Sequence, residues 1–176
     1  MSKKEIAKKL YILSLKGIKE RDLRNLSPTE RKMLCCRKGS CKLKKEFRKL
    51  IKVVLTGGVF DIIHAGHLFT LKEAKKYGDV LVVSIAKESF IRGKGREPLH
   101  SQKERAELVG ALKPVDIALM GKKNPSDMLK IVKPDVIVYG YDQKPFIKPK
   151  GVKIVMLKKK VKPHYLKSSK ILKKIR

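Results

Sequence analysis

The chain has 176 residues, 42% of them hydrophobic, which is enough to bury one domain-sized core with a short appendage. It has no apolar run of 18 or more residues and no apolar leader segment. We therefore expect a cytoplasmic protein without a membrane span or a secretory signal.

Charge is distributed unevenly along the chain. The 45 basic and 16 acidic side chains give a formal net charge of +29. Residues 1–52 and residues 143–176 carry +13 each, whereas residues 53–142 carry only +3. Basic ends of this kind attract polyanions such as nucleic acid, nucleotides or phosphorylated substrates. The alternative is a lysine-rich surface that only interacts with solvent.

Residues 1–50 are expected to form a basic helical extension. Ser2 and Glu5 have capping-box spacing, apolar residues follow at helical spacing, and Gly17 ends the helix. Ser27 to Glu30 repeats the start signal, with proline at the first helical position. Helices this short bury little alone, so we expect them to dock on the main domain. A helix-turn-helix module is the alternative.

Three cysteines, Cys35, Cys36 and Cys41, lie in this extension, and the rest of the chain has none. They lack the paired C-x-x-C spacing of a structural zinc site, and the first 63 positions contain no histidine. We therefore expect no disulfide framework but buried or idle thiols in a reducing, intracellular setting. A metal site completed by another subunit is the alternative.

From residue 51 the pattern changes to short apolar strands that alternate with helices. Strands are expected at 53–55, 80–86, 115–120, 135–139 and 152–157, and helices at 67–77, 101–112, from 124 onward and at 168–175. The alternation predicts an α/β domain over 51–176, a doubly wound, Rossmann-like parallel sheet covered on both faces. Ligands bind such sheets outside the carboxyl ends of the strands, where the strand order reverses.

The segment T-G-G-V-F-D-I-I-H-A-G-H, residues 56–67, joins the first of these strands to the first helix. Its two leading glycines permit close approach of the backbone to a phosphate, and the helix start offers free N–H donors. Gly66 keeps the turn free of side-chain bulk, so His64 and His67 are expected to point at one small volume. Imidazoles placed there can stabilise charge on a phosphorus centre and its leaving group. A zinc pair without an evident third ligand, or two capping histidines, are the competing interpretations.

Gly-Val-Phe-Asp followed by His-Ala-Gly-His resembles the signature of the cytidylyltransferase-like nucleotidyltransferases, whose HxGH motif binds the nucleoside triphosphate. The resemblance covers residues 52–176. It implies that a phosphate of an acceptor attacks the α-phosphorus of ATP or CTP and that pyrophosphate departs, with Mg²⁺ bridging the phosphates and no covalent enzyme intermediate. Relatives commonly form homodimers, and the sequence itself leaves the oligomeric state open.

The resemblance assigns roles residue by residue. Asp61 is expected to position metal or the loop, or to serve only as a turn residue, and no residue is assigned as a metal ligand. Lys162 stands only approximately where the family carries an arginine. The predicted catalytic residues are His64, His67 and Lys94. The predicted nucleotide-binding residues are Gly57, Gly58, Val59, Phe60, Asp61, His64, His67, Arg105, Gly140, Asp142, Ser168 and Ser169.

The acceptor is inferred from the same resemblance. The segments 95–98, 111–116 and 140–143 look most like those of archaeal-type FAD synthases, which transfer AMP from ATP to FMN. Glycerol-3-phosphate cytidylyltransferases, which usually carry an aromatic residue where Gln143 stands, and enzymes acting on other polyol or sugar phosphates are the alternatives. A nucleic-acid-binding protein with basic N-terminal helices and a nucleotide-sensing domain is the alternative of another class, but it would not need the pair His64 and His67.

Overall fold

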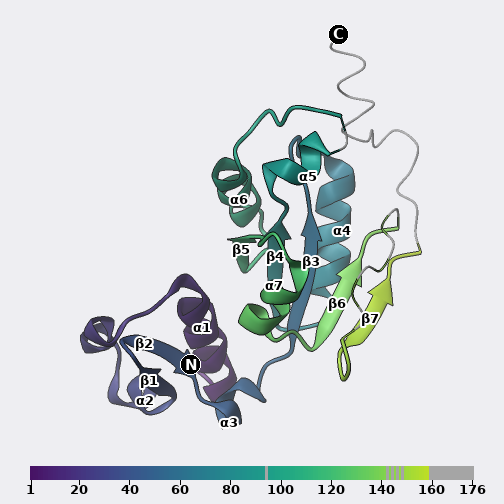
Figure 1. Ribbon diagram of the computed structural model, residues 1–176. Coiled ribbons are helices and arrows are strands. Elements are labelled where there is room, and N and C mark those ends of the chain that lie inside the picture. Colours follow the sequence, from purple (N-terminus) through teal and green to yellow (C-terminus); the bar gives the residue numbers. More distant parts are fainter. Residues whose placement is uncertain (94, 142, 144, 146, 148, 159–176) are drawn as a thin grey trace. The chain divides into compact units, whose positions relative to one another are not determined.

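A computed structural model describes residues 1–93, 95–141, 143, 145, 147 and 149–158 (Figure 1). The chain splits into two compact units, Met1–Lys52 and Val53–Arg176. Among the described residues, no helix combines the length and the apolar character that a membrane crossing requires.

The first unit begins with helices whose starts follow the predicted capping signals. Capping boxes join Ser2 to Glu5 and Ser27 to Glu30, and Gly17 ends the first helix in the left-handed conformation at φ 91°. The elements of this unit are α1 (Lys3–Lys16), the 3-10 helix η1 (Glu20–Asn25), α2 (Pro28–Lys32), β1 (Leu34–Arg37), β2 (Ser40–Leu43) and α3 (Lys45–Arg48).

The antiparallel hairpin of β1 and β2 corrects the expectation that this region is helical throughout. Its two-residue turn has positive φ at both central positions, 49° at Lys38 and 73° at Gly39, as hairpin turns require. Cys36 lies opposite Cys41 in the register, and the two form a disulfide, whereas Cys35 is free and exposed. The prediction of idle thiols was therefore wrong for two of the three cysteines.

The first unit also has a core of its own, which the sequence did not lead us to expect. Its helices and hairpin bury nine hydrophobic side chains to 8% exposure or less: Ala7, Leu10, Tyr11, Ile18, Leu26, Met33, Leu34, Cys41 and Ile51. The hairpin closes this core by packing β2 against α1. Docking of the unit on the main domain stays a prediction.

The second unit contains a five-stranded parallel sheet with the order β5-β4-β3-β6-β7, which confirms the doubly wound α/β prediction. Only the short helix α5 was not predicted, and the helix expected at 168–175 lies outside the described residues. The strands are β3 (Val53–Gly58), β4 (Val80–Ile85), β5 (Ile117–Met120), β6 (Val136–Tyr139) and β7 (Lys153–Met156). The helices are α4 (Ala65–Lys75), α5 (Glu88–Arg92), α6 (Gln102–Gly110) and α7 (Pro125–Val132).

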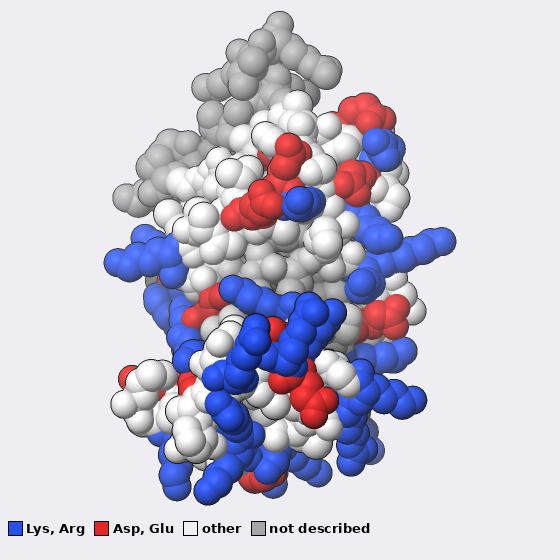
Figure 2. All heavy atoms as spheres, turned by 90° about the vertical axis from the view of Figure 1, so that its left-hand side faces the viewer, with Lys and Arg blue, Asp and Glu red and all other residues white. Residues whose placement is uncertain are grey.

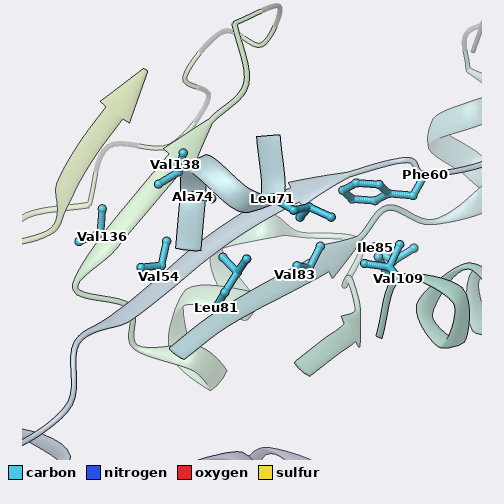
Figure 3. Close-up of a cluster of buried hydrophobic side chains, with 10 residues drawn as sticks. All are labelled: Val54, Phe60, Leu71, Ala74, Leu81, Val83, Ile85, Val109, Val136 and Val138. Atoms are coloured by element: carbon cyan, nitrogen blue, oxygen red, sulfur yellow. The ribbon is translucent and has the colours of Figure 1, made fainter. Parts of the chain in front are cut away.

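One face of this sheet is sealed by a hydrophobic cluster (Figure 3). Alternate residues of the three central strands meet Leu71 and Ala74 of α4, Val109 of α6, and the ring of Phe60. The strand residues in the cluster are Val54, Leu81, Val83, Ile85, Val136 and Val138. Because side chains alternate along a strand, their neighbours point to the opposite face.

The strand order reverses at β3, the central strand. From β3 the chain runs outward through β4 and β5 and then returns to β6 on the other side of β3. The buried Thr56 hydroxyl donates to the Val138 carbonyl at 2.8 Å and joins the two strands there. A ligand site is expected outside the carboxyl ends of β3 and β6.

Candidate active site

The segment 57–60, which ends β3 and which we call the glycine turn, is crowded. A Cβ added to Gly57 would lie 3.2 Å from the Ser84 carbonyl oxygen, and one added to Gly58 would lie 2.7 Å from the Phe60 ring. Phe60 itself adopts φ 55°, in the left-handed region that costs a non-glycine residue free energy. A side chain at Gly57 or Gly58 would therefore force its neighbour to shift, and the backbone at Phe60 is held in an unusual conformation next to the predicted site.

Two imidazoles come together where this turn enters α4. His64 is the residue that precedes the helix, His67 lies in its first turn, and their rings stack with centroids 3.9 Å apart and planes 24° from parallel. The Phe60 ring lies 4.9 Å from that of His67. A Cβ on Gly66 would come within 3.0 Å of the His64 ring, so glycine leaves the ring the space it occupies. The structure thus brings together the two histidines of the HxGH pattern.

Asp61 faces the protein backbone. Its side chain is buried and accepts hydrogen bonds from the backbone N–H of Leu99 at 3.0 Å and of His100 at 3.3 Å. Its carbonyl oxygen lies 3.1 Å from Nδ1 of His100. Of the roles considered for this residue, the geometry supports positioning of the loop that precedes α6.

No metal cluster accompanies the two histidines within the part of the chain that the structure describes, because no three His, Cys, Asp or Glu residues gather there closely enough to hold an ion. The zinc interpretation of the pair, and a metal site built on the cysteines, therefore gain no support from the described residues.

Arg105 was predicted to bind nucleotide, but its side chain is fully buried and bonded to backbone carbonyls. Nη1 donates to Val59 at 2.7 Å and to Ala86 at 2.9 Å, and Nε donates to His100 at 3.1 Å. The Glu88 carboxylate lies 3.9 Å from Nη2, and burial lowers the pKa of the Arg105 guanidinium. Arg105 therefore holds together the glycine turn, the end of β4 and the loop before α6, and its role in nucleotide binding stays a prediction.

Gln143 connects the two strands at the reversal point, a role that sequence reasoning missed. Its Nε2 donates to the Gly57 carbonyl at 2.9 Å, and its Oε1 accepts from the Gly140 N–H at 3.0 Å. Gly140, predicted to bind nucleotide, thus lies at the same edge of the sheet as the glycine turn. Gln143 and Gly57 are 86 residues apart, so no local pattern could have signalled this bond.

Gln102 performs a similar function between β4 and β5. Its Nε2 donates to the carbonyls of Ile85 at 2.7 Å and Gly121 at 2.9 Å. The sequence marked this residue only as part of a helix start.

Four other predicted site residues, Lys94, Asp142, Ser168 and Ser169, lie outside the described residues, as does Lys162. Their roles stay predictions.

A cavity of about 630 Å³ opens at the carboxyl ends of the strands, on the face of the sheet that carries α7. It begins at Gly57, Gly58 and Val59, the backbone that leads to the histidines. Most of its wall is apolar, and three exposed lysines, Lys87, Lys122 and Lys123, lie around it. The apolar side chains in its wall include Leu55, Phe90, Met128, Leu129, Ile137 and Ile147. A ligand with a large apolar part and an anionic group matches this lining.

Comparison with known proteins yields one consistent group. The model of the cytidylyltransferase-like family matches residues 55–175. The FAD synthase of Thermoplasma acidophilum is 48% identical over 98 residues, which are 54% of this chain and 67% of that protein. Those of Thermococcus sibiricus and Archaeoglobus profundus are 41% and 40% identical, over 73% and 72% of this chain and 94% and 86% of their own lengths.

A solved structure agrees with the fold. The crystal structure described as a lipopolysaccharide core biosynthesis protein from Thermoplasma volcanium superposes with a TM-score of 0.57 at 38% identity. The match covers 63% of this chain and 99% of that one. The residues that the family model matches, 55–175, all lie in the second unit.

Proposed function

The chain belongs to the cytidylyltransferase-like family, and we propose that it transfers AMP from ATP to FMN with release of pyrophosphate. The observation that carries the proposal is the pair of stacked imidazoles, His64 and His67, at the start of α4 directly after the glycine turn. The relatives named FAD synthase favour ATP and FMN among the substrates that the family uses.

The reaction needs positioning and charge stabilisation more than covalent chemistry. An oxygen of the FMN phosphate attacks the α-phosphorus of ATP, a new P–O bond forms, and the bond to the β-phosphate oxygen breaks as pyrophosphate leaves. His64 and His67 donate hydrogen bonds to phosphate oxygens that gain charge in this step. The first-turn N–H groups of α4 lie in the same place and attract the triphosphate. We retain Lys94, Ser168 and Ser169 as further phosphate contacts.

Mg²⁺ is proposed to accompany ATP. The described residues offer no cluster of ligands for it, and Asp61, the nearest acid to the histidines in the motif, is bonded to backbone N–H groups. Mg²⁺ commonly keeps several waters and binds substrate phosphates instead of a cage of protein ligands. Chelation with EDTA is expected to abolish turnover, and added Mg²⁺ to restore it.

The size and lining of the cavity favour FMN over glycerol 3-phosphate and other polyol or sugar phosphates as the acceptor. An FMN acceptor would place its flat, largely apolar ring system against the apolar wall and its phosphate toward the histidines. Glycerol 3-phosphate is small and polar and would leave most of the cavity of about 630 Å³ unfilled. Phe90, which is 58% exposed on α5, offers an aromatic surface for the FMN ring.

The test is a matrix of ATP and CTP against FMN and glycerol 3-phosphate, with products identified by mass. FAD from ATP and FMN is the expected product, and CDP-glycerol formed at a comparable or higher rate would contradict the proposal.

Phe90→Ala is expected to raise the KM for FMN about tenfold and leave the KM for ATP unchanged. Leu108→Ala, another exposed apolar residue of this unit, is the matched control.

A further inference from the structure

The surface of the first unit is strongly basic, and the proposed reaction does not use it. Residues 1–52 contain 18 basic and 5 acidic side chains. Figure 2 shows Lys and Arg side chains gathered over much of the lower part of the view. A charge of this density attracts polyanions over several ångströms.

Three of the five acidic side chains in this unit are bonded to backbone N–H groups at helix starts. Glu5 accepts from the Ser2 N–H at 2.6 Å and Asp22 from the Lys19 N–H at 2.8 Å. Glu30 is buried and accepts from the Ser27 N–H. Glu30 also pairs with the Lys9 ammonium at 2.7 Å. With 18 basic against 5 acidic side chains, the unit keeps a net charge of +13.

The hairpin presents part of this charge in a fixed arrangement. Leu34, Leu43 and the Cys36–Cys41 pair share one side of it in the register, and Cys41 and Leu34 belong to the core. Arg37 and Lys42 alternate with those positions and are exposed, as is Lys38 at the turn. Arg37, Lys38 and Lys42 together form what we call the basic hairpin face. The disulfide ties its two strands together.

The order of elements in this unit, α1, η1, α2 and then the hairpin, resembles that of a helix-turn-helix module followed by a hairpin. After α1, the backbone of Ile18 accepts from the Cys41 N–H at 3.0 Å and Lys19 bridges to Ser40, so this segment lies beside β2. Then η1 and α2 follow, separated by two residues, and the hairpin comes next. In such modules a helix and its flanking elements dock on duplex DNA through phosphate and groove contacts.

We propose that the first unit binds the phosphate backbone of duplex DNA through the basic hairpin face. A single-strand platform would need exposed aromatic rings, but in residues 1–52 Tyr11 is buried and Phe47 is half-buried. A membrane-surface helix would need an exposed apolar face, whereas only Met1 and Leu50 are large, apolar and exposed in this unit. Basic side chains without such surfaces fit a duplex contacted at its phosphates.

The experiment measures binding of the full chain to a fluorescent 20-base-pair DNA duplex by anisotropy over a salt series. The hairpin variant replaces Arg37, Lys38 and Lys42 with Gln. It is expected to weaken binding at least about tenfold and to lower the slope of log affinity against log salt by about 3. A second variant, Arg37→Lys with Lys38→Arg and Lys42→Arg, keeps the charge and is expected to bind as the unaltered chain does.

The matched control removes the same charge from the second unit by changing Lys72, Lys103 and Lys113, all exposed, to Gln. It is expected to change duplex affinity less than about twofold, and FAD synthesis should be kept by all three variants. Equal losses in the hairpin and control variants would overturn the proposal. So would tighter binding to an RNA duplex, to single-stranded DNA or to vesicles of anionic lipid than to the DNA duplex.

Discussion

The hydrogen bonds of polar side chains span different separations in sequence in the two units. In the second unit, Arg105 reaches Val59 across 46 residues and Gln143 reaches Gly57 across 86. In the first unit, Ser2 and Glu5 bond to each other across three residues and Lys9 reaches Glu30 across 21. Long-range bonds fix segments of a site relative to one another, whereas local bonds only start helices. Substitutions should therefore disturb catalysis in the second unit and only local stability in the first.

Arg105→Met is expected to have the largest effect and to test the long-range bonds directly. It leaves the carbonyls of Val59, Ala86 and His100 without their buried donor, which should destabilise the second unit by about 4 kcal/mol. Hydrogen exchange of the β4 amides measures this loss. Lys103→Met, on the exposed side of the same helix, is the control, and a difference below about 1 kcal/mol between the two would contradict the role given to Arg105.

His64→Ala and His67→Ala test the site that those bonds support. Each is expected to lower kcat for FAD synthesis by about a hundredfold or more, because each removes one preorganised group that stabilises transition-state charge. Thermal unfolding should change little, since neither side chain belongs to the hydrophobic cluster. Lys72→Ala, exposed further along α4, should keep full activity. Near-normal turnover in both histidine variants would contradict the proposed role of the two imidazoles in the reaction.

Sequence predicted best what is encoded locally. The capping boxes at Ser2, Ser27 and Ser101 place their helix starts correctly, because both partners lie within three residues. Apolar runs between helices gave the five parallel strands. The hairpin escaped prediction since the segments L-C-C-R and S-C-K-L are only four residues long and hold no β-branched residue.

The site was predictable only where its residues form a local pattern in the sequence. The HxGH pattern lies in one continuous segment, so His64 and His67 could be found and are in fact adjacent. The positions of Arg105 and Gln143 depend on the whole sheet being assembled. A motif gave Arg105 a place in the site, but only the fold reveals that its guanidinium faces backbone carbonyls.

In the first unit, removing the disulfide by the double change Cys36→Ser and Cys41→Ser should have a moderate and local effect. The two cysteines are five residues apart in sequence. Without the disulfide the unfolded chain gains conformational entropy, which should lower the free energy of unfolding of this unit by about 2 kcal/mol. Hydrogen exchange of α1 amides should report this loss while kcat stays constant. Cys35→Ser, exposed on the same hairpin, should change neither. An equal loss of protection in the Cys35→Ser control would contradict the stabilising role given to the Cys36–Cys41 disulfide.

Glu30 should produce the smallest effect, and one with a distinct pH dependence. The Lys9 ammonium at 2.7 Å and the Ser27 N–H at 2.8 Å lower the pKa of Glu30 from 4.5 to about 2. Because the folded-state pKa lies below the unfolded one, the ionised form stabilises the fold fully above pH 4.5, and this contribution is lost as the pH falls toward 2. Glu30→Gln should destabilise α1 by about 1.5 kcal/mol at pH 7 and remove that acid dependence, as read from amide exchange. Glu46→Gln removes an exposed acid of the same unit, and if it flattened the pH profile equally, the pairing of Glu30 with Lys9 and Ser27 would not be the cause.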